Sequence, residues 1–112
     1  MRRVEELLRL PVTVRGIELG RPVELLVDRG SRRLLGFDVL CGDAAHRFLP
    51  FAVASVQAGE IEVETPLVLL DFGQLDFYRE QATTLRNLEG EAAGLYVRRD
   101  GTLEPADATD PR

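Results

Sequence analysis

The sequence contains very little cysteine, since Cys41 is the only one among its 112 residues. A single cysteine excludes a disulfide within the chain, so we expect an intracellular, cytoplasmic protein. Lysine is missing altogether, and arginine supplies all 14 basic residues against 19 acidic ones. A protein with a net charge of −5 is a poor match for a phosphate backbone, so we expect no nucleic-acid partner.

Long hydrophobic stretches are missing too. No stretch approaches the ~18 apolar residues that a membrane helix needs, so we expect no membrane insertion. The opening MRRVEELLRLPV begins like a signal peptide, but Glu5, Glu6 and Arg9 interrupt any apolar region. With 45% hydrophobic and 29% charged residues, the chain has the composition of one globular domain with a modest core.

Common catalytic signatures are absent as well. The sequence has no GxxxxGK[ST], no GxGxxG and no HExxH motif. Glu60 and Glu62 alternate along a predicted strand, as is typical of a solvent-exposed face, while Asp28 and Asp38 fit turn and strand-end positions. We therefore expect no catalytic residue, no cofactor and no metal, and we predict that the protein is not an enzyme.

The corner formed by Cys41 and His46 is the main alternative. These residues flank the turn GDAA and would face each other across a hairpin. With Asp43 they would form half of a metal site, or a thiolate activated by imidazole. The other interpretation is a core cysteine and a histidine at the start of a strand. The corner thus supports an alternative hypothesis, a small-ligand-binding protein or an enzyme.

Alternating hydrophobic residues predict a mainly β protein whose five to six short antiparallel strands form a small barrel or a sandwich. Val23, Leu25 and Val27 repeat with period two, the spacing that places side chains on one face of a strand. The polar segments DRGSRR, GDAA and QAGE join successive β-type runs and predict hairpins. The predicted core residues are Phe37, Val39, Ile61, Val63 and either Phe48 or Phe51, whereas Glu60, Glu62 and Glu64 face outward.

Glycine and proline predict where this sheet turns or bends. Gly16 and the step GRP at 20–22 predict turns. Gly36 inside a strand predicts a bulge or a close approach of two backbones. Pro50 has no amide hydrogen, so its strand should lie at a sheet edge or bend there.

The pattern changes after Pro66. The spacing predicts a short helix around 74–81, and GLYVRRDGTLEP predicts a hairpin with Asp100-Gly101 at its turn. The apolar residues that need packing are Phe72, Leu75, Phe77, Tyr78, Leu85, Leu88, Leu95 and Tyr96. They pack either on the chain's own barrel or on a second chain, and we predict a homodimer in which residues 71–105 supply much of the interface. Residues 106–112 are predicted to be a frayed tail.

The run GIELGRPVELLVDRGSRRLLGFDVL, followed by RFLPFAVASVQAGEIEV, resembles a PRC-barrel domain. The residues that carry the resemblance are Gly20, Val27, Asp28, Arg33, Gly36, Phe37, Val39, Arg47, Phe48, Leu49, Pro50, Phe51, Ile61 and Val63. That family occurs in the cytoplasmic part of the photosynthetic reaction-centre H subunit and at the C-terminus of a ribosome maturation factor. The resemblance covers roughly residues 5–70 and implies a small barrel that docks on another protein.

The resemblance and the missing catalytic set together predict a non-enzymatic protein-binding or adaptor module. Three arginines crowd the DRGSRR tip, and Arg98 and Arg99 lie near the later hairpin. Such a cluster would grip an acidic partner or a phosphate, and the arginine loop therefore also belongs to the small-ligand alternative. The other interpretation is a charged loop that keeps the surface soluble. The predicted partner-binding residues are Arg29, Arg32, Arg33, Phe77 and Tyr78.

Overall fold

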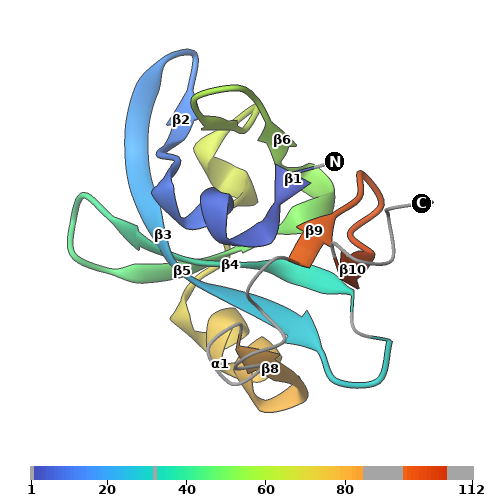
Figure 1. Ribbon diagram of the computed structural model, residues 1–112. Helices are drawn as coiled ribbons and strands as arrows, with labels where there is room; N and C mark the ends of the chain where they lie inside the picture. Colours follow the sequence, from blue (N-terminus) through green and yellow to red (C-terminus); the bar gives the residue numbers. More distant parts are fainter. Residues whose placement is uncertain (1, 32, 85–94, 106–112) are drawn as a thin grey trace.

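The computed structural model of the chain describes residues 2–31, 33–84 and 95–105 (Figure 1). These residues form a mainly β protein with one α-helix and three short 3₁₀ helices. The elements in chain order are β1 (Arg2–Arg3), η1 (Val4–Arg9), β2 (Val12–Val14), β3 (Ile17–Asp28), β4 (Leu34–Cys41), β5 (His46–Pro50), η2 (Phe51–Val53), β6 (Ser55–Val56), β7 (Ile61–Glu62), η3 (Pro66–Val68), α1 (Phe72–Gln81), β8 (Ala82–Thr84), β9 (Leu95–Val97) and β10 (Leu103–Pro105). None of the helices in the described ranges is long and apolar enough to cross a membrane.

The main sheet has the strand order β5-β4-β3-β2-β7-β6, with β8 beside the end of β3. The three predicted hairpins at DRGSRR, GDAA and QAGE are confirmed as β3–β4, β4–β5 and β6–β7. The prediction of antiparallel pairing throughout is wrong, because β7 runs parallel to β2. Among the described strands, β5 and β6 stand at opposite ends of this order and do not pair with each other. The strand pairing therefore does not close the sheet into a barrel.

The strand β3 is the longest element and pairs with three neighbours, β2, β4 and β8. It has 12 residues and runs as a long curved ribbon in Figure 1. The GRP step at 20–22 lies inside this strand, so the predicted turn there is wrong. The register instead shifts between Pro22 and Glu24, because proline has no amide hydrogen to donate to β4. A bulge therefore replaces the turn, while the predicted turn at Gly16 is present with a φ of 82°.

Gly36 and Pro50 behave as their residue types predict. A Cβ added to Gly36 would lie 2.2 Å from the carbonyl oxygen of Leu49 and 2.8 Å from the ring of Phe48. The neighbouring register of β3 shifts between Leu26 and Val27, opposite this glycine. Pro50 ends β5, the outermost strand of the order, and η2 begins at the next residue.

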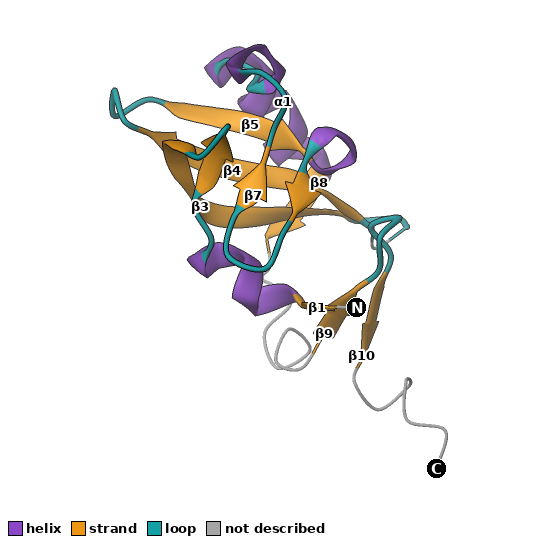
Figure 2. Cartoon of the chain, turned by 90° about the horizontal axis from the view of Figure 1, so that it is seen from above, coloured by secondary structure: helices purple, strands orange, loops and turns teal. Residues whose placement is uncertain are grey.

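The strands β3, β4 and β5 form a layer that is covered on both faces. Figures 1 and 2 show η1 on one side of this layer and α1 on the other. The larger hydrophobic cluster lies on the η1 side and contains Val4, Leu7, Val12, Leu25, Val27, Leu34, Phe37, Val39, Cys41, Leu49, Ile61, Val63 and Val97. The smaller cluster lies under α1 and contains Leu26, Phe48, Leu75 and Ala82. The predicted core is confirmed, with Phe48 rather than half-buried Phe51 fully inside.

The described residues after 70 include segments that pack against the rest of the same chain. The predicted helix is present and begins at Phe72, where the carboxylate of Asp71 accepts a hydrogen bond from the amide of Gln74. The predicted hairpin is β9–β10, which forms a second sheet with β1 in the order β1-β9-β10. Leu75 and Val97 are buried in the two clusters. Leu85, Leu88 and the predicted tail at 106–112 lie outside the described residues.

Candidate functional site

The structure separates Cys41 from His46. In the β4–β5 hairpin the residue opposite His46 is Leu40, and directly opposed residues share one face of a sheet. Cys41 follows Leu40 and therefore points to the other face, where its side chain is buried in the larger cluster. The hairpin is confirmed, but the prediction that these two side chains face each other across it is wrong.

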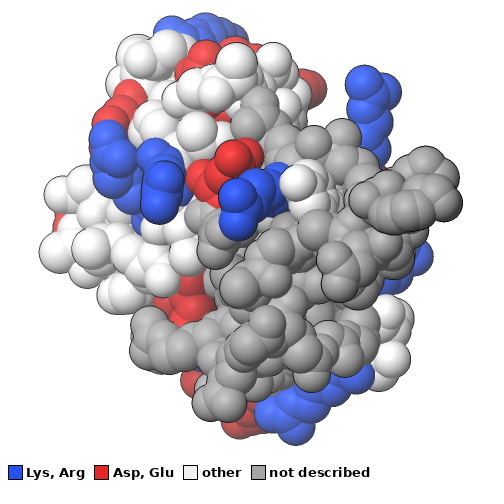
Figure 3. Space-filling model, in the orientation of Figure 1, with Lys and Arg blue, Asp and Glu red and all other residues white. Residues whose placement is uncertain are grey.

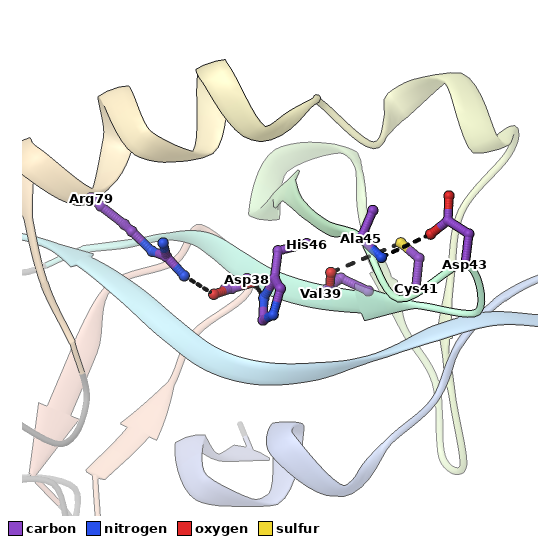
Figure 4. A network of polar contacts seen from close by, with 7 residues as sticks. All are labelled: Asp38, Val39, Cys41, Asp43, Ala45, His46 and Arg79. Carbon is purple, nitrogen blue, oxygen red and sulfur yellow. Dashed lines mark hydrogen bonds and ion pairs between the residues drawn. The ribbon is translucent and has the colours of Figure 1, made fainter.

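His46 instead joins a polar network under α1. Its Nδ1 lies 2.8 Å from Oδ1 of Asp38, and the guanidinium of Arg79 donates to Oδ2 of the same carboxylate. Figure 4 shows Arg79 reaching from α1 to Asp38 on β4, with His46 beside it from β5. The Asp38 side chain is 2% exposed, whereas those of His46 and Arg79 are 38% and 35% exposed. A buried carboxylate is thus held between two partly hydrated groups.

This network has part of the geometry of a catalytic dyad. A carboxylate that bonds Nδ1 of histidine fixes the orientation of the ring and leaves Nε2 for another partner. Catalysis would also need a nucleophile or a metal close to Nε2. Within the described ranges no group of three histidine, cysteine, aspartate or glutamate side chains is placed to hold a metal. The contacts that Asp38 makes with His46 and Arg79 support a structural role, in which Asp38 ties α1 to the sheet.

Sequence reasoning did not find this network. Asp38 lies between Phe37 and Val39, so strand alternation alone places it on the face opposite theirs. A carboxylate in the middle of an apolar strand that is covered on both faces needs a cation or several donors. That signal was present in the sequence. The identity of the cation was not, because Arg79 lies 41 residues further along the chain.

Asp43 and Arg47 form a separate, exposed ion pair in the β4–β5 hairpin. The guanidinium of Arg47 donates two hydrogen bonds to the carboxylate of Asp43, at 3.0 and 2.8 Å. These bonds, followed by one from the amide of Ala45, lower the pKa of Asp43 to about 2. The same pairing raises the pKa of Arg47. The carboxylate of Asp43 therefore binds Arg47 and Ala45 within the turn. It does not form the predicted metal corner with Cys41 and His46.

Two turns that carry the predicted arginines lie against each other. We call them the paired turns: residues 28–31 and 33, at the junction of β3 and β4, and residues 98–102, between β9 and β10. Arg33 pairs with Thr102 in an isolated bridge, and its side chain donates to the carbonyl of Asp100 at 2.7 Å. The amide of Leu34 donates to the carbonyl of Gly101, also at 2.7 Å. Arg32 lies outside the described residues.

The described arginines of the paired turns are exposed, and two of them, Arg29 and Arg33, donate to backbone carbonyl groups. Arg29 donates through Nε to the carbonyl of Ala82 at 3.1 Å, which connects the first turn to β8. Arg33, Arg98 and Arg99 are also exposed. The structure therefore brings together two arginine groups that are far apart in the sequence.

The predicted aromatic pair on α1 divides into one inner and one outer ring. Tyr78 is half-buried and stacks on Phe48, with ring centroids 4.3 Å apart and planes at 16°. Phe77 meets Tyr78 edge to face at 5.4 Å and is 52% exposed. Tyr78 thus belongs to the fold, and Phe77 remains available at the surface.

Comparison with known proteins adds no relative to this description. The sequence matches no protein-family model and no curated protein.

Proposed function

We propose that this protein is a non-enzymatic binding module of the PRC-barrel type that docks on another protein. The observation that carries the proposal is the arginine content of the paired turns. Arg29, Arg33, Arg98 and Arg99 are exposed there on a protein whose net charge is −5. Arginine is enriched at protein interfaces because its planar guanidinium binds carboxylates in two places at once.

The PRC-barrel assignment depends on the residue pattern and on how the sheet bends. The close approach at Gly36 and the strand end at Pro50 suit a small sheet that curls on itself. The parallel β2–β7 pair and the open strand order depart from a simple closed antiparallel barrel. The cytoplasmic setting remains a prediction from the single cysteine.

The contacts of Cys41 and His46 do not support the corner that these residues were predicted to form in the small-ligand or enzyme alternative. Cys41 is buried on one face of β4, and His46 binds Asp38 on the other face. Its second predicted location, the arginine loop at 29–33, is the same surface as the first paired turn, so one set of variants tests both functions.

The homodimer also remains a prediction, and less exposed apolar surface supports it. Leu75 and Val97 are buried within the same chain, which removes apolar surface on which the dimer depended. Phe77 is the exposed aromatic residue that still favours it. Light scattering at micromolar concentration tests the dimer. Dissociation by Phe77→Ser would place its interface on α1, and a monomeric full chain contradicts it.

The docking function is tested by affinity capture from the native host. We expect the wild type to retain a partner that the double variant Arg33→Gln/Arg99→Gln loses. Arg15→Gln is the matched control, because Arg15 is exposed at the β2–β3 turn, away from the paired turns (Figure 1). Equal recovery with all three proteins would remove the paired turns as the docking surface. Thermal stabilisation by a metabolite that the double variant abolishes would instead favour the small-ligand alternative.

A further inference from the structure

The paired turns form a positively charged surface on an acidic protein. Their described residues include the arginines at 29, 33, 98 and 99, and the aspartates at 28 and 100. In Figure 3, blue side chains protrude along the right-hand edge of the molecule, where both turns lie in Figure 1. The excess of arginine arises from the fold, because the two turns come from distant parts of the chain.

The two aspartates hold the turns in shape, and they offset only part of this charge, because two carboxylates face four described arginines. The carboxylate of Asp28 accepts hydrogen bonds from the amide and the hydroxyl of Ser31, both at 2.8 Å. The carboxylate of Asp100 accepts from the amide of Thr102 at 2.9 Å. These bonds lower the pKa of both aspartates, so both are ionised near neutral pH.

Arg29 and Arg33 keep N–H donors for a ligand. A guanidinium carries several N–H donors in a rigid planar fork. In the bonds described above, Arg33 uses one nitrogen on the carbonyl of Asp100, and Arg29 uses Nε on the carbonyl of Ala82. Both bonds go to neutral carbonyl groups, so they position the two guanidinium groups without forming an ion pair. The carboxylate of Asp100 offsets part of the charge of Arg33. A carboxylate from outside would gain charge-assisted hydrogen bonds here.

We infer that the paired turns bind an acidic segment of the partner protein, one that presents neighbouring aspartate or glutamate side chains. This inference depends on the proposed docking function and specifies the chemistry of the partner. A protein segment fits better than a nucleic acid, because the net charge of −5 repels a polyphosphate chain at long range while the local arginines attract single carboxylates.

The test measures the binding of a fluorescein-labelled poly-glutamate peptide to the full chain by fluorescence anisotropy at low ionic strength. We expect Arg33→Gln/Arg99→Gln to weaken binding by about tenfold, since exposed ion pairs contribute modestly and two of them are removed. Arg15→Gln, which removes one equivalent charge elsewhere, should change the affinity by less than about twofold. Thermal melting of each variant shows that it is folded.

Three outcomes would overturn the inference. Weakening by about threefold with Arg15→Gln, half of the double variant's effect in free energy, would mean that the peptide responds only to total charge. Tighter, arginine-dependent binding of a single-stranded oligonucleotide would assign the surface to nucleic acid. A self-association that the double variant abolishes, seen by light scattering, would make a second copy of this chain the occupant. If host capture depends on the paired turns but poly-glutamate does not bind, docking stands and the acidic segment is wrong.

Discussion

The two faces of the β3–β4–β5 layer are stabilised in different ways. The η1 side buries a large apolar cluster around Phe37 and Val39, to which several strands and the hairpin residue Val97 contribute. The α1 side buries a small cluster and adds the carboxylate of Asp38, which binds side chains from β5 and α1. The first face depends on the removal of apolar surface from water. The second depends in addition on a polar link with a defined geometry.

This difference shows how a short helix is fixed on a sheet. The helix α1 has only 10 residues, too few to be stable alone in water. Leu75 supplies its buried apolar contact, and Phe77 on the same helix faces solvent. Hydrophobic contacts alone have little directionality, whereas the ion pair of Arg79 with Asp38 joins a defined point of α1 to β4. The polar link therefore helps to set the position of α1, together with the apolar contacts.

The largest expected effect comes from truncating an aromatic ring on the apolar face. Phe37 is fully buried, so Phe37→Ala should lower the free energy of unfolding by ~3–5 kcal/mol, measured by urea denaturation. Phe48→Ala on the other face should cost an amount near the lower end of that range. Phe48 belongs to the smaller of the two apolar clusters, so its truncation removes fewer contacts with buried side chains. A larger loss for Phe48→Ala than for Phe37→Ala would reverse the comparison.

The next effect concerns the close contact between Gly36 and the ring of Phe48 on the α1 side of the layer. Gly36→Ala would place a methyl group against the carbonyl of Leu49 and the ring of Phe48. We expect a loss of ~2–3 kcal/mol in the free energy of unfolding, because the neighbouring strand must shift. Gly42→Ala is the matched control, since nothing lies within 4 Å of a Cβ at that position. Similar losses for both variants would show that strand packing at Gly36 is looser than described.

A smaller effect should follow from neutralising the polar link. Asp38→Asn keeps the shape of the side chain but removes the charge that binds Arg79 and His46. We expect a loss of ~1–3 kcal/mol, because the partners are partly exposed and regain water. Hydrogen exchange should show faster opening of α1 than of β4. Uniform acceleration across both elements would mean that Asp38 supports the whole fold rather than the attachment of the helix.

The smallest effect is expected at the exposed carboxylate of Asp43 in the β4–β5 hairpin. The pKa of Asp43 falls from an ordinary 3.8 to about 2, so its ion pair with Arg47 stabilises the folded state above about pH 4 and loses this effect as the pH falls toward 2. The difference in melting temperature between wild type and Asp43→Asn should therefore shrink from pH 5 to pH 2. A difference that is constant over this range would assign the effect to the turn backbone instead of the charge.

Most strands and hairpins were predictable from the sequence because they depend on local signals. Period-two alternation identified Phe37 and Val39 as inward residues, and the glycine-containing polar segments marked the turns. The parallel β2–β7 pair was not predictable, because local alternation says nothing about which distant strand becomes a neighbour. The bulge at Pro22 was mistaken for a turn, since proline and glycine mark both.

The candidate site was less predictable than the fold. The sequence identified the arginines of the first turn, and Arg98 and Arg99 of the second, but no local rule shows that the turns meet through Arg33 and Thr102. The separation of Cys41 from His46 follows from one register position, which the loop sequence GDAA did not determine. Contacts between distant segments thus decided how the two turns meet, and the register of a local hairpin decided the separation of Cys41 from His46.

The pairing of β1 with β9 has a consequence for the order in which the chain folds. Arg2 lies opposite Val97, so nearly the whole described chain separates two residues that share a sheet. The β3–β4 and β4–β5 hairpins need only short loops, and they can form while later residues are still being synthesised. The small sheet must wait until β9 has left the ribosome. Until then Val4 and Leu7 lack their contacts with this hairpin, and this part of the larger apolar cluster stays incomplete in the nascent chain.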